Sequence, residues 1–194
     1  MSLPEQNVAN PAQPFGPRAV FSDLYPLNEF YAARNTPLPV IAEIPAADVP
    51  EPYRSLLVHK TDMTSKLEAF HKRKIHIQPI ARHTTDNEYF REVTLVLDHT
   101  LKPVEFGAIK IILDLFPNEA QREILKEERP LGKILTEHKI AFASKPRAFL
   151  QIAADAFIQS ALVLDAEVTL YGRRNTLVDA WDRPLAEIVE ILPP

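Results

Sequence analysis

The segment at residues 87–98, NEYFREVTLVLD, is predicted to be a β-strand that carries a charged residue on its apolar face. Alternation places Arg91 in one row with Val93, Leu95 and Leu97, the row expected to pack on the core. Because a buried guanidinium without a partner costs several kcal/mol, we expect an anion beside Arg91. A planar carboxylate suits its forked, permanently charged group. A glutamate on a neighbouring strand, or a strand edge where the side chain reaches water, would satisfy Arg91 as well.

The stretch PLGKIL places Leu131 and Gly132 at the start of a predicted helix, directly after a proline. Backbone N–H groups there have no partner within the helix and can donate to an anion. Glycine also lets a ligand approach the backbone closely. A simple corner between two helices would account for the same residues.

The stretch PLAEIVEIL near the C-terminus carries Glu187 and Glu190 among aliphatic residues. Since they are three residues apart, they lie on opposite faces of a strand, and only one can point into the core. A carboxyl group in an apolar pocket has a raised pKa and can exchange a proton at neutral pH. Both faces of this strand are otherwise apolar, so alternation does not choose between the two. A salt bridge or an exposed edge would also explain either residue.

Composition and missing motifs exclude several functions. The chain has no cysteine, and its six histidines show no metal-ligand spacing, so we expect no thiol chemistry and no metal site. No dinucleotide, P-loop or GxSxG motif occurs, and no cofactor is expected. A net charge of −4 without a basic block argues against nucleic-acid binding. Without a signal peptide or an apolar run of about 20 residues, the protein is expected to be cytoplasmic, with no membrane span.

The first quarter of the chain differs from the rest. Ten of the 18 prolines lie within residues 1–52, which predicts no regular helix or central strand there. We therefore expect residues 1–50 to form a flexible or extended arm, flexible over 1–14 and lying on the domain over 15–50. Residues 51–194 are expected to form the domain itself.

The pattern from residue 52 onward predicts an alternation of helices with strand hairpins. The expected helices are 52–60, 61–72, 118–129, 131–138 and 156–164, and the expected strands are 74–82, 88–97, 104–113, 146–155, 167–179 and 184–192. Because hairpins predominate, this order indicates an α+β fold with an antiparallel sheet and helices packed on one face.

The segments SLLVHKTDMTSKLEAF, YFREVTL, PVEFG, PLGKIL, GRRNTL and RPLAEIVEILP occur in an order that resembles the chorismate lyase family. The resemblance covers about residues 54–194 and excludes the N-terminal arm. Chorismate lyases make 4-hydroxybenzoate from chorismate, and effector-binding domains of GntR-type transcription regulators share their fold. The resemblance implies a domain of this fold that encloses a small, mostly apolar ligand cavity.

The resemblance also implies which residues contact the ligand. Met63 matches a methionine that closes over the aromatic product, and Arg91 matches the arginine that holds a carboxylate. Leu131 and Gly132 match a leucine–glycine pair whose backbone amide meets the same ligand.

Two further matches are imperfect. Glu190 matches, by its local context, a glutamate near the substrate hydroxyl, whereas a count from the start of the strand places Val189 there. The second arginine of the family, directly after the glycine of the third strand, is Ala108 here. Lys110, two residues on and hence on the same face, is expected to supply the missing cation, and Arg147 is the alternative.

The expected function is a chorismate-lyase-like elimination of pyruvate from chorismate, which needs no metal or cofactor. Arg91 would pair with the ring carboxylate, and Glu190 would contact the ring hydroxyl and assist proton transfer. The alternative is a non-catalytic sensor or carrier that binds a small aromatic carboxylate. A scaffold in which Arg91 is merely salt-bridged is the third possibility. Residues 1–50 show no helix-turn-helix pattern, so DNA binding would need a partner chain.

Overall fold

Within residues 24–194, the part of the chain that the computed structural model describes, seven strands form one open sheet in the order β1-β5-β6-β7-β4-β3-β2. Every neighbouring pair is antiparallel. The strands are β1 (Ile41–Ile44), β2 (Ile75–Thr84), β3 (Glu88–Leu97), β4 (Pro103–Ile112), β5 (Ala143–Ala153), β6 (Thr169–Val178) and β7 (Pro184–Leu192). The helices are α1 (Leu27–Ala33), α2 (Tyr53–Leu57), α3 (Met63–His71), α4 (Asn118–Lys126), α5 (Leu131–Glu137) and α6 (Ala156–Leu162).

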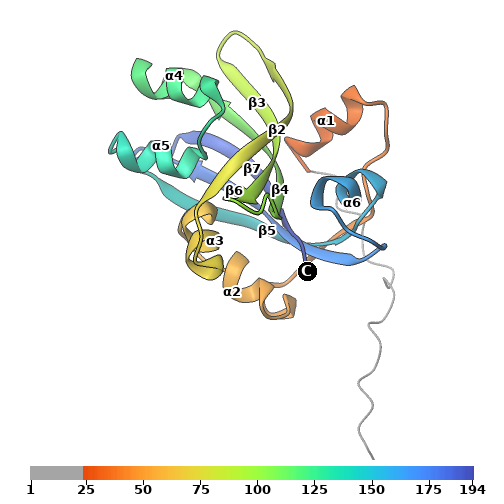
Figure 1. The fold of residues 1–194 in the computed structure, drawn as a ribbon. Helices are drawn as coiled ribbons and strands as arrows, with labels where there is room; N and C mark the ends of the chain where they lie inside the picture. The colour runs from red at the N-terminus through yellow and green to blue at the C-terminus, as the bar shows by residue number, and fades with distance from the viewer. Residues whose placement is uncertain (1–23) are drawn as a thin grey trace, which may run out of the picture.

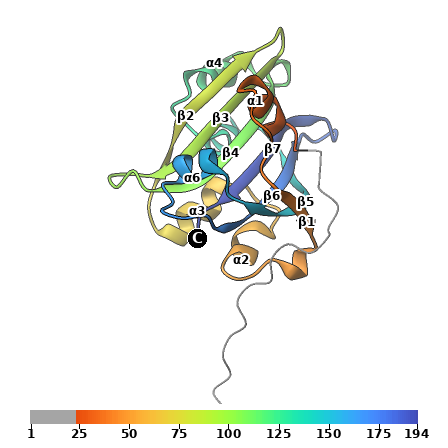
Figure 2. The ribbon, with the colours of Figure 1, turned by 90° about the vertical axis from the view of Figure 1, so that its right-hand side faces the viewer.

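The helices cover both faces of the sheet, as Figures 1 and 2 show. One apolar core lies between α1, α6 and the central strands, and it includes Phe106 of β4 and Val189 of β7. Two further cores lie on the opposite face, one under α2 and α3 and one under α4 and α5. The predicted α+β fold with an antiparallel sheet is confirmed. The expectation that helices pack on one face only is wrong, because β3, β4 and β7 are apolar on both sides and need cover on each.

From α2 to β7, the observed order of helices and strands is the predicted one. The region before residue 50 differs from its prediction, because residues 27–33 form a helix. That helix lies between Pro26 and Pro37, and a short proline-free stretch can adopt it. β1 then pairs with β5 at an edge of the sheet, so residues 24–50 add a helix and an edge strand to the core. The rest of the expected arm, residues 1–23, lies outside the described residues.

No helix in the described part of the chain is long and apolar enough to cross a membrane.

Candidate ligand-binding site

A cavity of about 60 Å³ lies between the central strands of the sheet and the first residues of α3 and α5. This volume is enough for several water molecules. Its floor comes from β3, β4, β7 and β6, and its sides come from residues 62–64 and 130–132. The wall is mostly apolar, with a few buried polar groups, which is the usual composition of a small-molecule site.

The strand register explains which side chains reach the cavity. Four residues lie opposite one another across four neighbouring strands: Arg91 of β3, Ile109 of β4, Ile188 of β7 and Asn175 of β6. Paired residues in a sheet share a face, so this row of four side chains points to the same side. All four line the cavity.

Arg91 is 2% exposed, and its Nε and Nη1 atoms have no hydrogen-bond partner within residues 24–194. Burial lowers the pKa of Arg91, while Tyr89 and Glu127 oppose that shift. The Glu127 carboxylate does not satisfy the two unpaired N–H groups, since it accepts hydrogen bonds from Tyr89 and Arg82. Arg91 therefore presents two unpaired N–H groups at the wall of a cavity, neither paired to a protein carboxylate nor exposed to bulk water.

Glu190 also lines the cavity and is buried. Its carboxylate pairs with Nε of Arg173, the residue opposite it on β6. Nη1 of Arg173 donates to the backbone oxygens of Leu57, at 3.0 Å, and of His59, at 3.2 Å. Burial and the Arg173 charge lower the pKa of His59 to about 4, so His59 is neutral at pH 7. Glu190 is thus an ion-paired carboxylate rather than a free acid.

Glu105 of β4 is the free acid of the site, and the sequence reasoning missed it. It is 5% exposed, lines the cavity, and its Oε2 atom has no partner among the described residues. Burial raises the pKa of Glu105 well above its usual range, the charge of Glu190 raises it further, and Arg173 partly offsets both. Burial therefore favours the protonated form of this carboxyl group, which can donate a hydrogen bond. Its signal in the sequence was a lone acid in the apolar strand PVEFGAIKII, on the same face as Gly107.

Asn175 of β6 is the second polar residue that the sequence reasoning missed. It is 1% exposed, and its Oδ1 atom accepts a hydrogen bond from Oγ of Ser144 at 3.1 Å. Its Nδ2 atom has no partner in the described part of the chain. Asn175 thus offers an amide donor at the wall of the cavity.

The expectation that Lys110 supplies a second cation to the cavity is wrong. Lys110 lies on the other face of β4, where its Nζ atom is 2.6 Å from Oε1 of Glu88, and it pairs in register with Glu187. The reason is parity, since Ile109 shares the face of Arg91 and residues 108 and 110 therefore point away. Arg147 does not serve either, because it is exposed and its Nε donates to Oγ1 of Thr176.

Met63 and Leu131, the first residues of α3 and α5, are buried and line the cavity. Gly132 lines it too, and it has a packing role. A Cβ atom at Gly132 would lie 2.8 Å from Oδ1 of Asp62, which caps α3 by accepting from the Ser65 N–H at 2.8 Å. Gly132 therefore lets the starts of the two helices meet beside the cavity.

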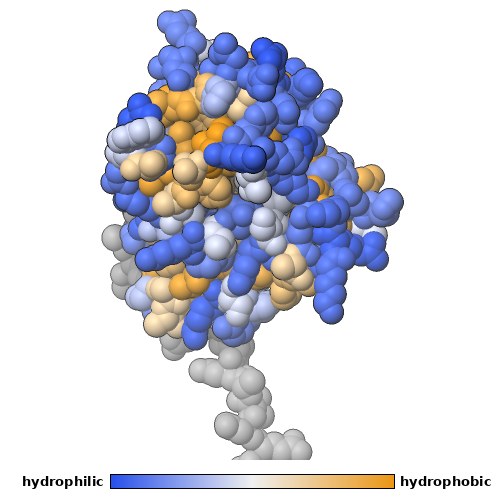
Figure 3. Space-filling model, turned by 90° about the vertical axis from the view of Figure 1, so that its left-hand side faces the viewer, coloured by the Kyte–Doolittle hydropathy of each residue, from blue (hydrophilic) through white to orange (hydrophobic). Residues whose placement is uncertain are grey.

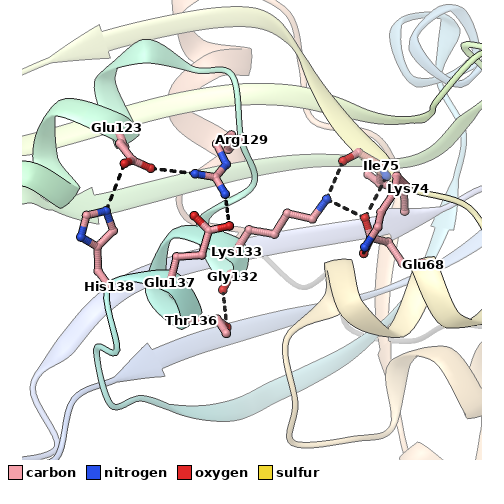
Figure 4. A network of polar contacts seen from close by, with 10 residues as sticks. All are labelled: Glu68, Lys74, Ile75, Glu123, Arg129, Gly132, Lys133, Thr136, Glu137 and His138. Carbon is pink, nitrogen blue, oxygen red and sulfur yellow. Dashed lines mark hydrogen bonds and ion pairs between the residues drawn. The ribbon is translucent and has the colours of Figure 1, made fainter.

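Ion pairs on the outside of the cavity hold α5 in place (Figure 4). Lys133 of α5 donates to the backbone oxygen of Ile75 at 3.1 Å and pairs with Glu68 of α3 at 2.6 Å. Arg129 pairs with Glu123 of α4 and Glu137 of α5. The side of the molecule on which α4 and α5 lie is largely hydrophilic, with a few apolar areas (Figure 3).

No family model matches the chain, and no curated protein matches it. Solved structures do match. PhnF from Mycobacterium smegmatis is similar with a TM-score of 0.54 and 16% identity, over 70% of this chain and 65% of that chain. The effector domain of PhnF, solved separately, has a TM-score of 0.52 and 16% identity, over 68% of this chain and 88% of that chain. The ligand-binding domain of a putative GntR-family transcriptional regulator from Bordetella bronchiseptica has a TM-score of 0.45 and 14% identity. The match covers 63% of this chain and 86% of that chain.

These similarities establish a fold and no more. The fold is similar to that of PhnF and of its effector domain. The chain spans about two thirds of the length of PhnF and most of its effector domain. None of the three similar structures is named as a chorismate lyase, and the third carries no weight because its TM-score is below 0.5.

Proposed function

We propose that this protein binds a small carboxylate in the cavity and acts as a ligand-binding domain rather than as an enzyme. The observation that carries the proposal is Arg91, a buried guanidinium with two unpaired N–H groups at a mostly apolar cavity wall. The similarity to the effector domain of PhnF supports a ligand-binding function through the shared fold alone, since the two chains are 16% identical.

A carboxylate fits Arg91 for physical reasons. Each buried N–H group without a partner costs about 1–3 kcal/mol. A ligand carboxylate can accept a charge-assisted hydrogen bond from Nε or from Nη1, the two nitrogens without a partner. Val93, Ile77 and Leu131 line the same cavity and would contact a flat apolar body such as an aromatic ring. In this arrangement Met63 and Leu131 would close the site from above.

Elimination of pyruvate from chorismate is the second candidate, and the buried Glu190 on the cavity wall favours it. Two observations weigh against it. Chorismate carries two carboxylates, whereas Lys110 points away from the cavity and Arg173 is already paired with Glu190. The carboxylate of Glu190 is also committed to that ion pair, which leaves it poorly suited to donate a proton. We therefore prefer ligand binding to catalysis.

The test is calorimetric titration of the full chain with benzoate and with 4-hydroxybenzoate. Arg91→Ala should weaken binding by about 1.5–3 kcal/mol, the value of a charge-assisted hydrogen bond, which is roughly ten- to 150-fold. Arg91→Lys should also bind poorly, because an ammonium cannot replace the fork. Arg147→Ala removes an exposed guanidinium and is the control. Equal affinities of wild type and Arg91→Ala would show that Arg91 is not the receptor.

A second measurement separates binding from catalysis. The protein is incubated with chorismate, and 4-hydroxybenzoate is followed by chromatography. We expect no product above the rate of the protein-free control. Turnover that Glu190→Gln or Arg91→Ala abolishes would contradict the non-catalytic proposal and establish the lyase.

A further inference from the structure

We infer that Arg82 keeps Arg91 free to bind a carboxylate, because Arg82 holds Glu127, a carboxylate of the protein that would otherwise occupy Arg91. Arg82 is therefore a positioning residue, which acts on the site through Glu127 and lies outside the cavity wall. The inference rests on the proposed function. It explains why a protein carboxylate beside Arg91 leaves that guanidinium unpaired.

Arg82 and Arg91 face each other across two neighbouring strands. Arg82 of β2 is the register partner of Arg91 of β3, so the two side chains leave the same face of the sheet, with about 5 Å between their Cβ atoms. Like charges directly opposite each other are destabilising. Two guanidinium groups in this position need an anion beside them, and Glu127 supplies one.

Glu127 reaches this pair from the end of α4. It is 7% exposed and ends the helix in the left-handed region, with φ at 58°. A glutamate is unfavourable there because its Cβ atom crowds the following carbonyl oxygen, and glycine or asparagine is the usual residue. Backbone strain of this kind persists where the surrounding contacts outweigh it. The contacts here are the hydrogen bonds that join the carboxylate to β2 and β3.

Both oxygens of Glu127 have partners other than Arg91. Oε1 accepts from the hydroxyl of Tyr89, and Oε2 accepts from Nη1 of Arg82. Burial and the hydrogen bond to Glu127 raise the pKa of Tyr89, so its hydroxyl stays a neutral donor. Burial lowers the pKa of Arg91, and Tyr89 and Glu127 partly offset this effect. Glu127 is thus near enough to act on Arg91 without pairing with it.

The charges of these residues do not balance. Arg82 and Arg91 carry two positive charges, Glu127 carries one negative charge, and Arg82 takes the ion pair. The side chain of Arg82 is 65% exposed, whereas Arg91 is buried, so the uncompensated charge is the one beside the cavity. Without Arg82, the carboxylate of Glu127 would turn to Arg91. It need not release Tyr89 to do so, because a carboxylate can accept about four hydrogen bonds.

Calorimetric titration of the full chain with benzoate, in two backgrounds, tests the inference. Arg82→Ala should weaken binding by about fivefold or more, although Arg82 does not line the cavity. In a Glu127→Gln protein the same substitution should change the affinity by less than about twofold, because glutamine has no charge that could compete with the ligand. Loss of a nearby positive charge would instead weaken binding equally in both backgrounds, and that result would overturn the inference.

Two further variants serve as controls in the same titration. Arg82→Lys should bind benzoate within about twofold of wild type, because an ammonium can keep an ion pair that uses one nitrogen of Arg82. Arg147→Ala removes another exposed guanidinium and should bind like wild type. Wild-type affinity in Arg82→Ala, or equal losses in Arg82→Ala and Arg82→Lys, would overturn the inference while Arg91-dependent binding leaves the proposed function intact.

A measurement without ligand, which needs no variant of Glu127, tests the same point by urea unfolding. Arg91→Met should raise the urea midpoint of wild type, because two unpaired N–H groups are removed. In the Arg82→Ala background it should lower the midpoint, because Arg91 would then be paired with Glu127 and its loss would leave a buried carboxylate without a cation. An equal rise in both backgrounds would overturn the inference. If wild type does not bind benzoate, the proposed function fails for aromatic acids, and the unfolding result still decides whether Arg82 keeps Glu127 from Arg91.

Discussion

Arg91→Met should make the ligand-free protein more stable and abolish carboxylate binding. Arg91 is buried with two unpaired N–H groups, so the folded protein without ligand bears the cost of their desolvation. Methionine keeps most of the apolar length of the side chain and has no donors to satisfy. A residue retained for binding at the expense of stability is expected to behave in this way.

The size of the effect follows from the contacts of Arg91. Two unpaired buried donors cost about 1–3 kcal/mol each. The substitution also removes the favourable effect of Tyr89 and Glu127 on the guanidinium, which offsets part of that gain. Replacement of buried ionic groups by apolar residues is neutral or stabilising by about 1–4 kcal/mol in other proteins. We therefore expect a gain of about 1–3 kcal/mol in the free energy of unfolding.

Urea unfolding followed by circular dichroism measures this gain, with an unchanged slope against urea concentration as the check that the same surface is exposed. Arg147→Met is the control and should lie within about 0.5 kcal/mol of wild type, because Arg147 is exposed. Benzoate at 100 times its dissociation constant should add about 2.7 kcal/mol to wild type and nothing to Arg91→Met. Arg91→Met less stable than wild type by more than 1 kcal/mol would refute the reasoning, since Arg91 would then be a satisfied structural residue.

Three further substitutions test the site and its supports. Folding raises the pKa of Glu105 above its unfolded value, so the folded protein retains a proton that the unfolded chain releases. The free energy of unfolding therefore falls as pH rises from about 4.3 toward the folded pKa, by up to about 1.4 kcal/mol per pH unit. Glu105→Gln removes that loss. The difference in free energy of unfolding between Glu105→Gln and wild type, measured by urea unfolding, should therefore favour the variant more at pH 7 than at pH 4.5. An equal difference at the two pH values would show that Glu105 titrates normally. Gly107→Ala places a Cβ atom 2.8 Å from the backbone oxygen of Val189 and should cost about 1–3 kcal/mol in the same assay, whereas a neutral change would mean that β4 and β7 separate easily at this point. Asp62→Ala removes the cap of α3 and should cost about 1 kcal/mol, which thermal unfolding would detect, while Asp62→Asn should largely retain stability.

The order of the elements could be predicted because its signals are local. Strand alternation, prolines at helix starts and capping residues each act within a few residues. The sequence from residue 52 onward predicted every α-helix and every strand in order, but not the short 3-10 helix at Leu113–Leu115. Alternation also placed Arg91 on the inner row of its strand, where the structure has it. The helix at residues 27–33 was missed because proline density was averaged over a whole segment that contains a short proline-free stretch.

The polar residues of the cavity wall could not be predicted, because their positions depend on strands that pair far apart in sequence. Helices on both faces bury both sides of β4 and β7, so an apolar pattern alone did not tell which of Glu187 and Glu190 points toward Arg91, or that Lys110 points away. Glu105 and Asn175 line one cavity only because β4 pairs with β7 and β7 pairs with β6. The sequence by itself determined the α-helices and strands from residue 52 onward and the inward row of Arg91, since these follow from local patterns and from the geometry of a single strand. Only the tertiary structure decided which acids share the face of the sheet that carries Arg91. A side-chain period of two residues fixes the two faces of one strand but leaves open which of them faces the cavity.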